Sequence, residues 1–259
     1  MKQYIENFKK YKFLLYELIK KGIKLKYRRS YLGVLWTLLE PLLTMAVLTM
    51  VFSGFYGKSD HTFPVYILTG RLLYSYFNNG TKVALKSIQS NARMIKKVYV
   101  PKYIYPLSGV IYNYIIFLIS LIVLVGVAAV LRVKPTIYLL QAVIPLFLLF
   151  VMTLGVGLIL ATMNVFFRDL EYLWNVVLML IMYASAIFYD VSKVIENGYG
   201  WLFKINPLYM IIANFRECVL YGQPLSMEYL VPAAIFSFGS LFIGVYVFFK
   251  KQDEFILHI

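Results

Sequence analysis

Apolar residues occur along this chain in long continuous runs rather than in the alternating pattern of β-strands. A helix needs about 20 mostly apolar residues to cross a bilayer, because the hydrocarbon layer is about 30 Å thick and each residue adds about 1.5 Å. Continuous runs also favour helices over a membrane β-barrel. The pattern therefore predicts an all-α integral membrane protein with six transmembrane helices, over residues 33–56, 63–83, 106–130, 136–166, 170–189 and 229–250.

Two charged residues lie inside these predicted spans, Glu40 in the first and Arg71 in the second. A charge near the centre of a membrane helix costs about 2.5–3.5 kcal/mol on insertion scales, so such residues usually face a cavity or the bundle interior. We therefore expect both to be functional. Glu40, which the helix-kinking Pro41 follows, lies nearer the inner end of its span, so pairing with the deeper Arg71 is the less favoured prediction.

The segments between the runs differ in their content of basic residues, and this difference predicts orientation. With the N-terminus inside, the inner segments hold nineteen Lys and Arg residues and the outer segments hold six. We expect a single transmembrane domain over residues 1–259, multi-pass in the cytoplasmic (inner) membrane, with both termini cytoplasmic. Its parts are an interface segment 1–32, spans one to five over 33–189, an outer region 190–228, span six over 229–250 and a tail 251–259.

Composition excludes a water-soluble protein. Apolar residues make up 61% of the chain and charged residues 15%, against about 45–50% and about 25% in soluble domains. The net charge of +14 suits anionic lipid headgroups at the membrane surface rather than nucleic acid. The single cysteine, Cys218, leaves no possibility of an intramolecular disulfide.

The segment before the first span has the spacing of an amphipathic helix. Its apolar residues recur three, four or seven positions apart, with lysines between them, which is typical of a helix lying along the membrane surface. The helix serves either as a plain surface anchor or as a docking site for a partner, and its spacing leaves both readings open. The apolar positions are Tyr4, Phe8, Tyr11, Leu15, Leu18 and Leu25.

A second basic segment, residues 87–97, follows the second span. It contains Arg93, Lys96 and Lys97 and no acidic residue, and it is long enough to form a short helix. The segment is either a determinant of orientation or a lever on which a cytoplasmic subunit pushes. Its charge does not separate these two hypotheses.

The region between spans five and six contains two apolar stretches that are too short to cross, 199–203 and 209–220. Turn sequences at 206–208 and 221–224 bound the second stretch. We expect two short re-entrant helices that dip back from the outer surface. Backbone that is irregular at membrane depth needs protein or water around it, so they imply a cavity or a dimer interface. The alternative is an external cap lying flat on the lipid headgroups.

The sequence contains no convincing catalytic or metal-binding motif. Gly57-Lys58-Ser59 is similar to the end of a phosphate-binding loop, but Phe52 stands where that loop needs a glycine. The two histidines, His61 and His258, have no neighbours at metal-ligand spacing. We therefore expect no catalytic residue, no metal and no cofactor in this chain.

Two blocks of sequence resemble the permease subunits of ABC-type polysaccharide exporters. Residues 26–41 contain a basic pair, a serine, Leu-Gly and Leu-Trp before a proline, with Glu40 where many relatives carry Asn. The second block is made of residues 166–170, 187–189, 206–208 and 215–216. The resemblance covers nearly the whole chain and is strongest to the O-antigen exporters, with teichoic acid and capsule exporters next.

This resemblance implies a type-2 ABC exporter: a homodimer of this chain with two copies of a separate cytoplasmic ATPase, which would hold ATP and Mg. Its substrate would be a long polysaccharide on a polyprenyl diphosphate lipid, moved from the cytoplasm to the outer face. By position, residues 4–25 match the family's interface helix. The residues that match the coupling helix are Ile88, Asn91, Arg93, Lys96 and Lys97, and those that match the external gate are Trp201, Phe203, Pro207, Tyr209 and Phe215.

Aromatic residues, 18% of the chain, fit a conduit for sugars, because their rings stack on the apolar faces of sugars while Tyr hydroxyls form hydrogen bonds. Aromatic belts at the membrane interfaces use part of this content. At the inner mouth, Arg28 and Arg29 would bind the lipid diphosphate or, alternatively, lipid headgroups. The candidates on the spans that line the family's channel are Trp36, Phe52, Phe55, Tyr56, Tyr183, Phe188 and Tyr189.

Three other classes of membrane protein share parts of this pattern. An ABC exporter of small molecules or drugs has the same six-span layout, but would usually lack the basic pair followed by serine at the first span. A membrane glycosyl or lipid transferase needs acid, base or metal-binding residues that the sequence does not offer. A stand-alone channel does not need the two basic docking segments.

Overall fold

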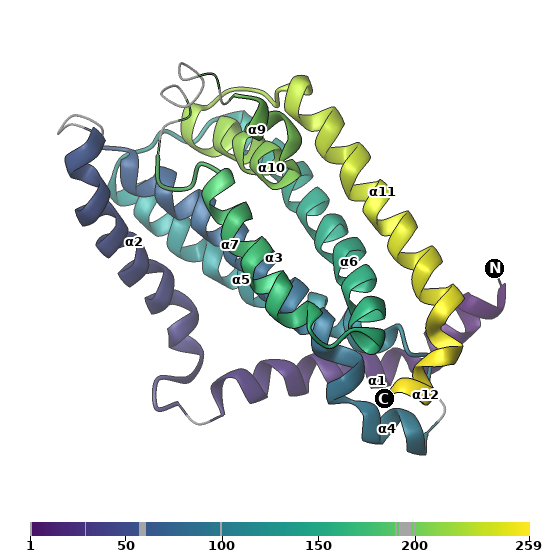
Figure 1. Cartoon of the computed structure of the whole chain (residues 1–259). Coiled ribbons are helices and arrows are strands. Elements are labelled where there is room, and N and C mark those ends of the chain that lie inside the picture. Colours follow the sequence, from purple (N-terminus) through teal and green to yellow (C-terminus); the bar gives the residue numbers. More distant parts are fainter. Residues whose placement is uncertain are drawn as a thin grey trace.

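The computed structural model describes residues 2–28, 30–56, 61–98, 100–189, 191, 198 and 200–259, with the side chains among them except those of residues 2–10 and 53–56. These residues are largely helical and form no β-strand, which confirms the all-α prediction. The helices are α1 (Lys2–Tyr27), α2 (Trp36–Tyr56), α3 (Phe63–Ser90), α4 (Ala92–Lys97), α5 (Ile104–Val130), α6 (Val143–Phe166), α7 (Leu170–Ala184), α9 (Trp201–Ile205), α10 (Pro207–Arg216), α11 (Met227–Lys251) and α12 (Phe255–His258). Most of the long helices stand side by side as a bundle, while α2 leans away from it at one side, α1 runs across one end, and short helices lie at both ends (Figure 1).

Shorter turns of helix connect some of these elements. A 3₁₀ turn, Gly33–Leu35, precedes α2, and another, Ile137–Ala142, precedes α6. A turn of π-helix, Glu217–Tyr221, follows α10 and ends at Gly222, whose φ of 61° is left-handed. Glycine adopts this conformation without a steric cost, which explains why the helical segment stops there.

Four helical stretches are long and apolar enough to cross a membrane: Gly33–Phe52, Ile104–Val130, Ile137–Phe166 and Met227–His258. They correspond to the predicted spans one, three, four and six. The helix at the second predicted span, α3, has 28 residues, but Arg71, Asn78 and Asn79 make it less apolar. The helix at the fifth, α7, is apolar but has only 15 residues, which is about 22 Å of helix against a hydrocarbon layer of about 30 Å.

Three predicted boundaries were wrong. The fifth predicted span does not continue to residue 189, because α7 ends at Ala184 and the chain turns at Ala186, whose φ of 46° a helix does not allow. The basic segment 87–97 is not separate from the second span, since α3 continues through Ser90 and only Ala92–Lys97 forms a helix of its own. The second outer stretch begins as a helix at Pro207.

The centre of the bundle is made by α3, α5 and α6, with α11 packed along α6. The backbones of α6 and α11 are in contact where the two helices cross. A Cβ atom built on Gly155 would lie 2.3 Å from the amide nitrogen of Leu241, and one on Gly244 would lie 2.5 Å from the carbonyl oxygen of Gly155. Small residues at the crossing allow this approach, as is usual between membrane helices.

Further helices lie at opposite ends of the bundle. The helices α1, α4 and α12 lie at one end, and α9 and α10 lie at the other (Figure 1). A hydrophobic cluster joins α1, α4 and α12 to α5, α6 and α11. Its buried members are Leu15, Ile88, Ile95, Val100, Ile104, Tyr105, Leu158, Ala161, Val165, Phe248 and Phe255.

Candidate functional site

Two long helices, α2 and α7, contribute little to the core. Among the described side chains, each has one buried residue, Thr37 on α2 and Leu178 on α7. Their exposed apolar residues recur at three- and four-residue spacing, so each helix carries an apolar stripe along its length. The stripe of α2 includes Leu43, Val47, Met50 and Val51, and that of α7 includes Leu173, Val176, Leu180 and Tyr183. In a membrane, these stripes face either lipid or another protein.

The aromatic residues predicted for the conduit fall into two groups. Trp36 and Tyr183 lie on the open faces of α2 and α7 and are 41% and 58% exposed. Phe52 and Phe188 stack on each other, with ring centroids 5.5 Å apart. The hydroxyl of Tyr189 donates to the carbonyl oxygen of Tyr183. The Phe52–Phe188 stack thus joins the end of α2 to the segment after α7, and the side chains of Phe55 and Tyr56 lie outside the described residues.

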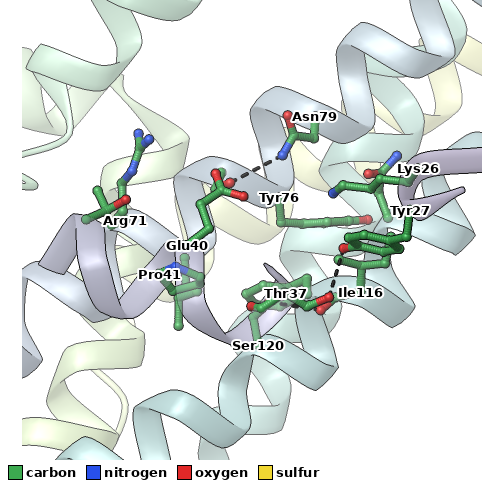
Figure 2. A pocket seen from close by; sticks show the side chains of 15 residues that line it. Lys26, Tyr27, Thr37, Glu40, Pro41, Arg71, Tyr76, Asn79, Ile116 and Ser120 are labelled. Atoms are coloured by element: carbon green, nitrogen blue, oxygen red, sulfur yellow. Dashed lines mark hydrogen bonds between the residues drawn. The ribbon is translucent and has the colours of Figure 1, made fainter. Parts of the chain in front are cut away.

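A polar pocket lies between α2, α3 and α5, and the last residues of α1 also line it (Figure 2). Its walls carry one acidic residue, Glu40, and two basic residues, Lys26 and Arg71. The pocket is partly open, and its interior of about 50 Å³ has room for a few water molecules. The other polar or aromatic residues that line it are Tyr27, Thr37, Thr44, Ser75, Tyr76, Asn79, Asn113, Phe117 and Ser120.

Hydrogen bonds, rather than ion pairs, tie this pocket together. The hydroxyl of Thr37 donates to the hydroxyl oxygen of Tyr27 at 2.8 Å, and the hydroxyl of Ser120 donates to the carbonyl oxygen of Thr37 at 3.2 Å. No ion pair joins Glu40 to either base within the part of the chain that the structure describes. The pocket wall removes water from the Lys26 amine and so lowers its pKa, while the Glu40 carboxylate opposes this shift.

One of the two predicted entry residues, Arg28, follows the residues of α1 that line this pocket. Arg28 is exposed and borders a groove along α1 together with Lys20, Lys21 and Lys24. Met94 of α4 forms part of the same groove, which therefore runs between the two basic segments predicted from the sequence. Arg29 lies outside the described residues.

The helix α4 presents its basic residues away from the bundle. Arg93, Lys96 and Lys97 are exposed, while Ile95 is only 7% exposed and packs into the cluster at that end. Ile88 is fully buried in the last turns of α3. The side chain of Asn91 donates to the carbonyl oxygen of Ser87 at 2.8 Å and joins the two helices.

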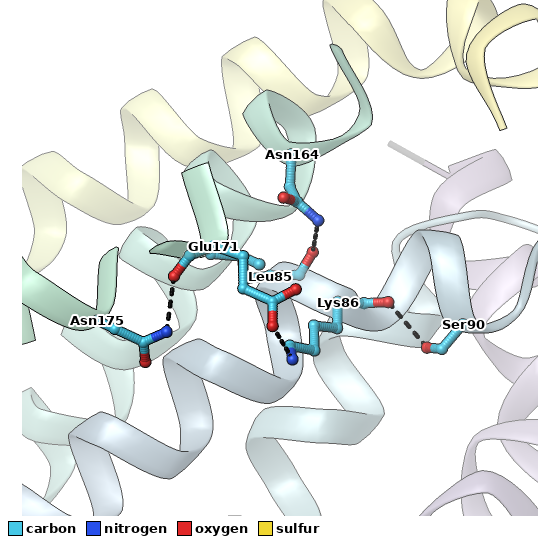
Figure 3. A network of polar contacts seen from close by, with 6 residues as sticks. All are labelled: Leu85, Lys86, Ser90, Asn164, Glu171 and Asn175. Atoms are coloured by element: carbon cyan, nitrogen blue, oxygen red, sulfur yellow. Dashed lines mark hydrogen bonds and ion pairs between the residues drawn. The ribbon is translucent and has the colours of Figure 1, made fainter. Parts of the chain in front are cut away.

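Polar contacts link the same end of α3 to the turn between α6 and α7 (Figure 3). Lys86 forms an ion pair with Glu171 in the first turn of α7. The amide nitrogen of the Asn164 side chain donates to the carbonyl oxygen of Leu85 at 3.1 Å, and that of Gln89 donates to the carbonyl oxygen of Asn164 at 2.9 Å. These contacts join the last turns of α3 to the end of α6 and the start of α7.

Most residues predicted for the external gate are buried within the chain. Phe203 and Tyr209 are 3% and 5% exposed, and their ring centroids lie 4.7 Å apart. Phe215 is equally buried. Trp201, by contrast, is 56% exposed at the start of α9, and Pro207 occupies the first turn of α10. The two short helices therefore pack against the bundle through aromatic residues.

Comparison with known proteins decides the family. The sequence pattern that describes ABC-2 type transporters matches residues 14–220 of this chain. The chain belongs to the ABC-2 type transporter family. Members of this family are multi-pass membrane components of transporters, which agrees with the four apolar helices that are long enough to cross.

Several relatives resemble the chain over nearly its whole length. A protein of Klebsiella pneumoniae named O-antigen export system permease protein RfbA is 30% identical over 244 residues, covering 93% of both chains. A protein of the same name from Myxococcus xanthus is 26% identical, with 97% of both chains covered. The polysialic acid transport protein KpsM of Escherichia coli is 24% identical, covering 95% of this chain and 96% of its own.

Sequence reasoning missed one residue of this ABC-2 type protein. Arg216 appeared in the sequence as one of six outer basic residues, but its side chain is only 3% exposed. No periodic pattern marks it, since it stands at the end of a ten-residue helix. The sole signal was its place beside Phe215 in the block shared with polysaccharide exporters.

Proposed function

We propose that this chain is the channel-forming permease subunit of an ATP-driven exporter that moves a polyprenyl-diphosphate-linked polysaccharide, an O-antigen, across the cytoplasmic membrane. The similarity over 93% of the chain to proteins named O-antigen export permeases carries the proposal. Capsular polysaccharide or teichoic acid is the second candidate cargo, and the similarity to polysialic acid transport proteins supports the capsular one. A small-molecule or drug exporter is a more distant alternative.

In this proposal the chain crosses the membrane six times, with both termini in the cytoplasm. The helices α3 and α7 complete the set of spans. Although α3 contains polar residues, it is buried along most of its length and packs on α5 and α6, so these residues need not face lipid. The short helices α9 and α10 form the external gate.

Two copies of the chain enclose the conduit between them, with α2 and α7 of each copy facing it. Their apolar stripes and the rings of Trp36 and Tyr183 would then contact sugar rather than lipid. Many weak stacking contacts suit a polymer that slides, because a tight site would arrest it. Arg28, at the inner end of α1, binds the lipid diphosphate through charge-assisted hydrogen bonds.

Two copies of a cytoplasmic ATPase drive the movement and contain the nucleotide site. They push on α4 through the exposed Arg93, Lys96 and Lys97. Because Ile95 anchors α4 in the cluster below the bundle, a push on α4 reaches α3 and then α7 through the Lys86–Glu171 ion pair.

The test combines reconstitution with a charge reversal. The chain is coexpressed with the ABC ATPase encoded beside it, and copurification, ATP hydrolysis and export of lipid-linked glycan into vesicles are measured. The triple variant Arg93→Glu, Lys96→Glu and Lys97→Glu should lower ATP-driven export about tenfold or more, while abundance stays within about twofold, because exposed charges contribute little to stability.

A control reverses two exposed charges at the other end, Arg132→Glu and Lys134→Glu, and should export normally. Failure of the unmodified complex to move any polysaccharide would overturn the proposed function. Normal export by the α4 variant would overturn the coupling role of α4 alone.

A further inference from the structure

A buried guanidinium group joins three elements at the end of the bundle where α9 and α10 lie. The Nη1 atom of Arg216 donates to the carbonyl oxygen of Ala186 at 3.0 Å, and Nη2 donates to the carbonyl oxygen of Tyr66 at 3.0 Å. Its Nε atom lies 3.4 Å from the hydroxyl oxygen of Thr69. The group also stands 3.5 Å above the centroid of the Tyr66 ring. Arg216 belongs to α10, Tyr66 and Thr69 to α3, and Ala186 to the segment after α7.

The segment after α7 is shaped to receive this group. Ala186 has a φ of 46°, which is unfavourable for any residue with a side chain. Its carbonyl oxygen lies within hydrogen-bonding distance of both the Arg216 guanidinium and the Tyr66 hydroxyl, at 3.0 Å in each case. A cation close to the last carbonyl groups of a helix is also stabilised by the helix dipole. The strained turn is therefore held from α10 and from α3 together.

Space for the guanidinium comes from a missing side chain. A Cβ atom built on Gly70 of α3 would lie 2.6 Å from Nη2 of Arg216, whereas the next nearest atom, Cγ2 of Ile187, lies 3.3 Å away. A methyl group at this position would therefore displace the guanidinium first, while the protein keeps Arg216 and its net charge. This provides a probe that does not remove the arginine.

We propose that Arg216 is a positioning residue of transport, a latch that ties the gate helix α10 and the outer end of α7 to the outer end of α3, so that the three move as one unit. The inference rests on the proposed function for its meaning in transport. The helix α7 buries one residue, Leu178, and is joined to α3 by hydrogen bonds from Tyr74 to the carbonyl oxygen of Leu178 and from Trp174 to Thr81, so it moves with α3 when it is pushed at its inner end.

An apolar side chain would hold α10 in place with less cost than an arginine. Taking a guanidinium out of water carries a large free-energy cost, and well-packed apolar replacements of buried charges are often as stable. The rest of α10 already packs through apolar residues such as Ile211 and Ile212, which are fully buried. The guanidinium adds a fixed orientation of α10, because its planar fork binds two carbonyl groups on two different elements.

The native cysteine reports on this latch. Cys218, the only cysteine, lies two residues after Arg216 and is 1% exposed. Burial raises the pKa of its thiol, so reaction with N-ethylmaleimide should be slow in the unmodified complex. In the Gly70→Ala variant we expect labelling about tenfold faster, because freeing α10 raises the population of locally open states. Gly126→Ala, where a Cβ meets nothing within 4 Å, should label as the parent does.

The dependence of Cys218 labelling on nucleotide distinguishes a role of Arg216 in transport from a role in stability alone. In the unmodified complex, ATP binding should change the rate of Cys218 labelling, and in Gly70→Ala the rate should no longer depend on nucleotide. Export per complex should fall at least several-fold while ATP hydrolysis continues. Arg216→Lys, which keeps the charge but lacks the fork, is the second variant and should behave in the same way if Gly70→Ala fails to fold.

The outcomes distinguish the two proposals. Labelling of Gly70→Ala and Arg216→Lys at the parental rate, or an unaltered nucleotide response, would overturn the latch. Faster labelling with unchanged export would show that the contact holds the helix but has no part in transport. Absence of export by the unmodified complex would refute the proposed function, and the labelling experiment would still decide whether Arg216 joins α7 to α10.

Discussion

A single amide side chain, that of Asn206, serves two helices at once. Its oxygen accepts hydrogen bonds from the backbone amides of Leu208 and Tyr209, at 3.0 and 3.3 Å, and so caps the N-terminus of α10. Its nitrogen donates to the carbonyl oxygen of Ala184 at 3.1 Å and to the hydroxyl of Ser185 at 2.9 Å. The residue therefore begins one helix and satisfies the end of α7.

Removal of this side chain should destabilise the protein in a graded way. Asn206→Ala loses the cap and both donated hydrogen bonds, which together should cost about 2–3 kcal/mol of unfolding free energy. Asn206→Ser keeps a capping oxygen and should cost about half as much. The measurement is unfolding in mixed micelles titrated with SDS, with Asn175→Ala as an exposed control. Equal losses for the serine and alanine variants would contradict the capping role.

Among single residues, the sequence identified two charged residues inside the predicted spans and missed a third, which is buried. Charges inside apolar runs are expensive, so Glu40 and Arg71 stood out, and the structure places both on the wall of one pocket. Arg216 did not stand out, because it lies in the predicted outer region 190–228, where a basic residue can contact water at no cost. Only the folding of α10 against α3 shows that its guanidinium is buried.

At the scale of elements, the length of each apolar run predicted most helices. The runs at 33–56, 106–130 and 229–250 correspond to α2, α5 and α11 with shifts of a few residues. The end of α7 was missed because the sequence stays apolar through residue 189, whereas the backbone turns at Ala186 to meet α10 and α3. Tertiary contacts decided that boundary.

The crossing of α6 and α11 gives a prediction for a pair of elements. Gly155→Ala puts a methyl group within 2.3 Å of the Leu241 backbone, so the two helices must separate. We expect a loss of about 1–3 kcal/mol of unfolding free energy in mixed micelles, the usual cost of overpacking. Gly239→Ala on α11 has no atom within 4 Å of its Cβ and should be neutral or slightly stabilising, because alanine favours helix over glycine. A neutral Gly155→Ala would show that this close crossing does not form.

At the scale of the whole molecule, a single copy exposes three apolar stripes. One lies on α2, with Leu43, Val47 and Val51, and another lies on α7. An outward stripe on α11 is similar in composition, with Ile235, Phe238 and Phe242 exposed. Exposure alone therefore does not separate a protein-facing surface from a lipid-facing one.

The proposed dimer predicts which of these surfaces faces protein and which faces lipid. In a Cys218→Ser background, Val47→Cys on α2 should be joined to the second copy by a bismaleimide, because the proposed dimer places the two α2 stripes across from each other. Phe242→Cys on α11, which is 76% exposed, should remain monomeric on denaturing gels, because the proposed dimer turns α11 toward lipid. The experiment is read in native membranes. Dimers from the α11 variant and none from the α2 variant would reverse the assignment of these faces.

The sequence by itself determined that this protein is a membrane-embedded helical bundle, that its basic segments gather on one side, and that its relatives are polysaccharide exporters. Run length, charge asymmetry and ordered motifs are local or additive properties, so they are readable without coordinates. Only the tertiary structure decided where α7 stops, which helices touch through glycines, and that Arg216 reaches the carbonyls of Tyr66 and Ala186. Those features depend on residues far apart in the chain meeting at one place, and no local pattern records such a meeting.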